Sequence, residues 1–175
     1  MKREANALER KKTVLLTFLI TTIAYLLWFG GILLAPYLRS RASPWSSLVY
    51  SVYSPVCHQA ADRSLLCFGQ PLAVCARCTG IYMGFCLGLV LYPFLRGWRR
   101  IALPPGRVFI IVSAPIVLDT AANFLGLWQT VTAVRLTTGV LWGTIVPFYF
   151  IAGMADLFIS RQKKTLEIGP GFPLE

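Results

Sequence analysis

The stretch PVCHQAADRSLLCFGQPLAVCARCTGIYMG, residues 55–84, holds four of the five cysteines of the chain and its only histidine. It lies between an apolar run that ends near Pro36 and another that begins near Gly80. The chain as a whole is 56% hydrophobic and 14% charged, which is too apolar for a soluble domain. The stretch therefore predicts a Cys/His cluster at the mouth of a membrane helix.

Four apolar runs are long enough to cross a hydrocarbon core of about 30 Å, which takes about 20 helical residues. They span residues 13–35, 80–95 (longer if 75–79 joins the helix), 108–127 and 138–159. The first run is too long for the core of a signal peptide, so it predicts an anchor. We expect an all-α protein, with one membrane domain over residues 1–175 that is built as a four-transmembrane-helix bundle.

The positions of the basic residues predict how the chain crosses the membrane. The net charge is +10, and most of the 17 Lys and Arg residues fall in the tail 1–12, the connection 96–107 and the tail 160–175. Because basic residues concentrate in cytoplasmic loops, we expect both termini in the cytoplasm and the segments 36–79 and 128–137 outside the plasma membrane. Membrane lipid accounts for this charge, and a nucleic-acid partner is not expected.

The outer segment 36–79 is too long for an idle connection, because structureless loops beyond about 15 residues are uncommon. Its first half, SPWSSLVYSVYSPV (residues 43–56), interleaves aromatic and aliphatic residues with serine. This pattern predicts an interfacial or re-entrant helix with Trp45, Tyr50 and Tyr53 at the level of the lipid headgroups.

The second half of this segment offers five metal ligands, which are Cys57, His58, Cys67, Cys75 and Cys78. Zinc takes four cysteines, or three cysteines and a histidine, so zinc is the predicted cofactor. Two other chemistries stay open. In an oxidising compartment the pairs 57/67 and 75/78 would form inert disulfides, or the C-x-x-C at a helix start would exchange electrons with the other pair and with a quinone.

The segments CHQ (57–59), RS (63–64) and CARCTGIYMG (75–84) resemble an uncharacterised family of small bacterial and archaeal polytopic membrane proteins. A weaker echo of the same family lies at residues 119–139, with an Asp/Asn pair and Arg-x-x-Thr-Gly. The family has no established activity. The resemblance therefore indicates which residues matter without saying what they do.

Two polar residues, Asp119 and Asn123, lie four apart in the third apolar run and hence on one helix face. An ionisable residue inside a membrane helix is a functional hypothesis by default, and its expected partners are Arg77 and Arg135. Asp119 is the candidate for proton transfer in this set. The alternative interpretation is a buried structural ion pair.

Arginines precede Thr-Gly at two outer helix starts, in RCTG (77–80) and RLTTG (135–139). Together with Arg63, these guanidinium groups and the two helix N-termini predict a site for phosphate or carboxylate. We therefore expect a pocket for an anionic ligand, such as a phosphorylated lipid headgroup, beside the metal. Asn123 lines this pocket, and His58 serves as a metal ligand or as a catalytic group.

A non-enzymatic interpretation stays open. In it the chain is a membrane subunit of an oligomer or larger complex, and the metal or disulfides only stabilise the loop. Glycines recur every four residues at 80, 84 and 88 and again at 139 and 143. Small residues at this spacing let helix backbones approach, so they predict contact between the second and fourth helices. Cys86 is expected to be an ordinary packed thiol.

Overall fold

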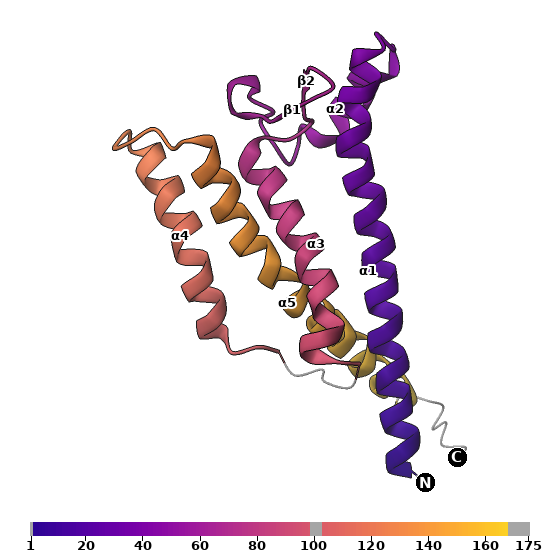
Figure 1. The fold of residues 1–175 in the computed structure, drawn as a ribbon. Helices are drawn as coiled ribbons and strands as arrows, with labels where there is room; N and C mark the ends of the chain where they lie inside the picture. Colours follow the sequence, from indigo (N-terminus) through magenta and orange to yellow (C-terminus); the bar gives the residue numbers. More distant parts are fainter. Residues whose placement is uncertain (1, 99–102, 168–175) are drawn as a thin grey trace, which may run out of the picture.

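Four long helices dominate the computed structural model, which describes residues 2–98 and 103–167 (Figure 1). They are α1 (Lys2–Ser40), α3 (Ala76–Arg96), α4 (Gly106–Phe124) and α5 (Thr132–Glu167). Each contains a window that is long and apolar enough to cross a membrane. The expected all-α fold with four apolar helices and a cysteine-bearing loop is confirmed.

The helices alternate in direction (Figure 1). The start of α1, the end of α3, the start of α4 and the end of α5 lie at one end of the molecule. The opposite end carries the end of α1, the short helix α2, the cysteine loop and the turn between α4 and α5. The segments that the sequence predicts outside the membrane therefore share one end.

The helix bounds differ from the predicted spans for local reasons. α1 runs through the charged residues 2–12, most of which are good helix formers. α4 ends at Phe124, three residues before the predicted end, because Gly126 adopts a φ of 70°. The backbone N–H of Leu127 bonds the carbonyl of Ala122 at 3.0 Å, which closes the helix as glycine-terminated helices commonly do. Residues 168–175 of the expected C-terminal tail lie outside the described residues.

Glycines bring α3 and α5 into backbone contact, as the four-residue spacing predicts. A Cβ atom at Gly80 would lie 2.3 Å from the carbonyl oxygen of Leu136, and one at Gly139 would lie 2.5 Å from that of Arg77. Each glycine thus packs against the carbonyl three residues before the opposite glycine. The relation repeats one turn on, at Gly84 and Gly143. The two helices therefore pair through reciprocal contacts that admit no side chain.

The short helix α2 (Trp45–Tyr53) forms where the sequence predicts one and packs on the upper end of α1. Trp45 is exposed, but Tyr53 is only 3% exposed. The Tyr53 hydroxyl donates to the carbonyl of Trp28 at 2.7 Å, over Gly31, where a Cβ atom would be 2.1 Å from that hydroxyl oxygen. The prediction that Tyr53 lies among lipid headgroups is wrong, because the absent side chain of Gly31 lets it enter the core.

A small hairpin, which the sequence did not reveal, packs against α1. It follows a 3-10 turn (Ala61–Arg63) and pairs β1 (Leu66–Cys67) with β2 (Gln70–Pro71). Phe68 and Gly69 both have positive φ, which gives the two-residue turn that matches strand twist. The Tyr50 hydroxyl donates to the carbonyl of Pro71 and so ties the hairpin to α2.

α4 is the least buried of the four long helices, with only Asp119 and Ala122 buried. It packs along α5, where the indole N–H of Trp142 donates to the Ser113 hydroxyl at 2.9 Å. The hydroxyl of Tyr149 donates to the carbonyl of Pro105 at 3.0 Å. Few apolar side chains on α4 meet protein, so most of this helix presents an apolar surface outward.

Candidate metal centre and polar network

Three cysteines converge at the mouth of α3. Cys57 follows α2, Cys75 directly precedes α3, and Cys78 lies in its first turn. Their three sulfur atoms lie within 4.8 Å of one another, and those of Cys75 and Cys78 are 3.6 Å apart. Sulfurs on one tetrahedral zinc ion, at Zn–S distances of 2.3 Å, are about 3.8 Å apart. The cluster could therefore hold a metal after only a small closure.

The backbone bends around the sulfur of Cys57, a residue that is only 6% exposed. This sulfur accepts the backbone N–H of Cys75 at 3.1 Å and that of Gln59 at 3.5 Å. Gln59 has a φ of 51°, which is uncommon for a residue other than glycine. Its side-chain amide donates to the carbonyl of Tyr50 at 2.6 Å and so holds the bend. Hydrogen bonds of this kind orient and stabilise thiolate ligands.

The environment of Cys75 favours its thiolate. The hydrogen bond between the Cys75 and Cys78 sulfurs lowers the pKa of Cys75 below the usual range, and the backbone N–H groups of Cys78 and Arg77 act in the same direction. Burial opposes this shift without cancelling it. A thiol at a helix N-terminus commonly behaves in this way, and the thiolate is the form that binds metal.

Two of the five predicted metal ligands lie apart from this cluster. His58 is exposed, although it adjoins Cys57 in sequence. Cys67 lies on β1, partly buried against the hydrophobic cluster under the loop, and is not among the converging sulfurs. Cys86 is exposed on α3, so the expectation of a packed thiol is wrong.

A polar network links the outer ends of α3, α4 and α5. Arg77 forms an ion pair with Asp119, whose side chain is only 6% exposed. The other carboxylate oxygen of Asp119 accepts the Thr130 hydroxyl at 2.7 Å. Both oxygens of Asp119 are therefore engaged, and the structure pairs this residue with one of the arginines that the sequence proposed.

Asn123 connects Arg135 to the same network. With its amide oxygen turned toward α5, Asn123 accepts a guanidinium N–H of Arg135 at 3.2 Å and the backbone N–H of Thr130 at 3.1 Å. We prefer this orientation because the opposite one would set the amide N–H group against two donors. Sequence reasoning missed Thr130, and its place in the turn between two polar helix ends was the only available signal.

The metal centre and the network lie on different faces of α3. Cys78 packs with Tyr82, one turn on, against the buried cluster that includes Ile32 of α1. Arg77 reaches α4 instead. Consecutive helical residues point about 100° apart, which separates the two sites that the sequence joined in one pocket. Arg63 belongs to neither site, since it pairs with Asp62 at 3.3 Å and both side chains are more than half exposed.

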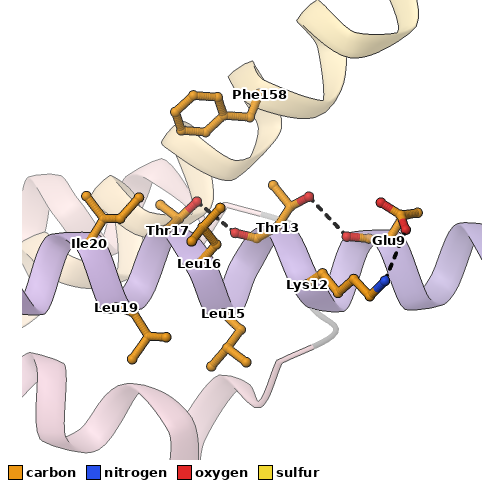
Figure 2. Close-up of a pocket in the computed structure, with 9 residues that line it drawn as sticks. All are labelled: Glu9, Lys12, Thr13, Leu15, Leu16, Thr17, Leu19, Ile20 and Phe158. Carbon is orange, nitrogen blue, oxygen red and sulfur yellow. Dashed lines mark hydrogen bonds and ion pairs between the residues drawn. The ribbon is translucent and has the colours of Figure 1, made fainter.

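A groove of about 580 Å³ lies toward the other end of α1, between its residues 9–20 and Phe158 of α5 (Figure 2). Its polar groups already have partners: Lys12 pairs with Glu9 at 3.5 Å, and the hydroxyls of Thr13 and Thr17 bond carbonyls one turn earlier. Leu15 and Leu19 point away from Phe158. This groove offers no converging ligands or catalytic groups.

Residues 57–149, more than half of the chain, match the family described as predicted membrane protein, DUF2085. The chain belongs to the DUF2085 family. An uncharacterized protein of Methanocaldococcus jannaschii is 36% identical over 152 residues, which cover 83% of this chain and 97% of that protein. An uncharacterized protein of Methanothermobacter thermautotrophicus is 29% identical over 85 residues, 49% of this chain and 75% of that protein. No solved structure matches the chain.

The DUF2085 match fits the four apolar helices, and the protein is a multi-pass membrane protein. The matched region begins at Cys57 and ends at Tyr149. It therefore contains the three converging thiols and the whole polar network, whereas α1 and α2 precede it. The resemblance seen in the sequence is confirmed.

Proposed function

We propose that this protein is a membrane metalloprotein that binds one zinc ion through Cys57, Cys75 and Cys78. The convergence of the three sulfurs carries the proposal. Soft thiolates suit zinc, and three protein ligands leave one tetrahedral position for water or another ligand. The basic residues near the start of α1 and the ends of α3 and α5 favour a cytoplasmic side there, so in this proposal the zinc site lies at the outer surface of the plasma membrane.

The polar network supplies the second part of the proposal, a site for an anion. Its two guanidinium groups and one carboxylate leave a net charge of +1. The Nε atoms of Arg77 and Arg135 are buried and have no hydrogen-bond partner within the part of the chain that the structure describes. Guanidinium N–H groups match phosphate and carboxylate oxygens. In this proposal Asp119 holds Arg77 in place, since one of its oxygens pairs with that guanidinium and the other accepts the Thr130 hydroxyl.

Thiol labelling tests the metal site directly. In a chain with Cys67→Ser and Cys86→Ser, only the three converging cysteines remain. We expect a maleimide reagent to label almost none of them in the purified protein and all three after a strong chelator removes the metal. Full labelling without the chelator would contradict the proposal. The same chain denatured in the chelator serves as the control for complete labelling.

A thiol–disulfide enzyme is the second candidate, and the C-x-x-C geometry favours it. The sulfurs of Cys75 and Cys78 are 3.6 Å apart at a helix N-terminus. Their oxidation to a disulfide would release two electrons and two protons, which a membrane quinone would accept. Cys67 lies outside the converging sulfurs, so the electron exchange expected between the pairs 57/67 and 75/78 is less favoured. Metal-free protein with a 75–78 disulfide would support this candidate.

A further inference from the structure

An apolar groove of about 700 Å³ runs along α4, and residues of α3 and α5 complete its walls. It extends from Phe109 to Phe124, which is about 22 Å at the helical rise of 1.5 Å per residue. One leaflet of a hydrocarbon core is about 15 Å deep. The groove is therefore long enough for a chain that spans one leaflet.

The polar groups of the groove are already satisfied. Ser113 accepts the indole N–H of Trp142, and the Thr120 hydroxyl donates to the carbonyl of Ile116 at 2.6 Å. The other lining side chains are apolar, among them Ile81 and Phe109. The groove thus suits a hydrocarbon chain better than a polar ligand.

Charge gathers at one end of this groove. Thr120 and Phe124, which line it, directly follow Asp119 and Asn123 of the polar network. At this level the network has a net charge of +1 and buried Nε atoms without partners. A positive site at the end of an apolar groove matches a ligand with an anionic head and an apolar tail.

We infer that this face binds one anionic phospholipid, with an acyl or isoprenoid chain along α4 and the phosphate at Arg135 and Arg77. The inference rests on the anion-binding part of the proposed function and is independent of the metal. A partner helix would also cover the groove, but it would leave the surplus charge uncompensated. A phospholipid accounts for both features, because its chain fills the groove and its phosphate compensates the charge.

Native mass spectrometry of the full chain tests this inference, with phosphatidylglycerol and phosphatidylcholine offered in equal amounts. We expect one phosphatidylglycerol to be retained in preference. Arg135→Gln removes one charge-assisted hydrogen bond and should weaken that preference about tenfold. Ala121→Trp, which fills the groove, should reduce retention of both lipids.

Matched controls keep the test specific. Arg39→Gln removes a charge at the same end of the molecule, and Leu118→Trp introduces the same Trp side chain on an exposed part of α4 outside the groove. Both should leave lipid retention unchanged. Arg135→Lys keeps the positive charge but lacks the forked N–H groups of the guanidinium, so it should retain more phosphatidylglycerol than Arg135→Gln. A general loss of folding would not produce this order.

Binding of inorganic phosphate distinguishes the anion site from the lipid inference. If it binds in a way that Arg135→Gln abolishes while no lipid is retained in preference, the anion site stands and the lipid inference is overturned. If Arg135→Gln changes neither phosphate binding nor lipid preference, both fall. If Ala121→Trp and Leu118→Trp reduce lipid retention equally, the lipid chain does not lie in the groove and that part of the inference is overturned.

Discussion

The first turn of α3 carries two kinds of chemistry on two faces. Toward α1 and the loop, Cys75 and Cys78 join Cys57 in a cluster of soft ligands. Toward α4, Arg77 pairs with Asp119 in a network of charges and hydrogen bonds. The first cluster gathers soft ligands that could hold a metal ion, whereas the second pairs its carboxylate with one of its two guanidinium groups and keeps a surplus positive charge. Adjacent residues of one motif therefore serve separate sites.

The cysteine cluster and the polar network differ in what they indicate about a ligand. Three thiols whose sulfur atoms lie within 4.8 Å of one another form a ligand set that could hold a metal ion. A buried ion pair, in contrast, requires its own partner to remain stable. Variants that affect one face and spare the other are the sharpest tests of this division.

The largest effect is expected at Asp119. Asp119→Asn leaves Arg77 half-buried without a counter-charge, and breaking such a pair costs about 3–5 kcal/mol of unfolding free energy. Denaturant unfolding in detergent measures this loss. Asp62→Asn is the matched control, because its exposed pair with Arg63 should contribute about 0–1 kcal/mol. Equal effects of the two variants would show that the network is not a buried structural unit.

Gly80→Ala should come next. The new Cβ atom would lie 2.3 Å from the carbonyl oxygen of Leu136, so α5 must move. Overpacking of this kind costs about 1–3 kcal/mol. Because α5 carries Arg135, anion binding should weaken while the zinc content stays the same. Gly30→Ala, where nothing lies within 4 Å of the new atom, is the control. Loss of zinc in Gly80→Ala would mean that the two faces are not independent.

Thr130→Val should have the smallest effect of the three. It removes the hydroxyl that donates to Asp119 at 2.7 Å, and a hydrogen bond to a charged group contributes about 1.5 kcal/mol or somewhat more. Thermal unfolding measures the change. Thr137→Val is the control, since that exposed hydroxyl only bonds carbonyls of its own helix. If both variants unfold alike, Thr130 does not help to hold Asp119.

Much of the fold follows from local sequence. The apolar runs predict the four helices, and the four-residue glycine spacing predicts the contact of α3 with α5, because both signals depend on helix periodicity alone. The pairing of Asp119 with Arg77 follows from the cost of an isolated charge in a membrane helix. These features need no knowledge of how the loop folds.

The choice among the candidate metal ligands could not be predicted. Which sulfurs converge depends on the docking of α2, where Tyr53 enters over Gly31, and on the hairpin turn at Phe68 and Gly69. Residue spacing within a loop does not encode such contacts. The separation of the two sites could not be predicted for a related reason. The sequence predicts the anion pocket of Arg77 and Arg135 beside the metal, whereas the helical turn directs Arg77 toward α4 and away from the three sulfurs.

Zinc content is the most direct test of the central claim. Elemental analysis of the purified full chain should find about one zinc ion per chain. Cys57→Ser, Cys75→Ser and Cys78→Ser should each lose it, while Cys67→Ser and His58→Ala should keep it, because these two residues lie outside the converging sulfurs. A metal-free wild-type protein, or loss of zinc in Cys67→Ser but not in Cys57→Ser, would contradict the account.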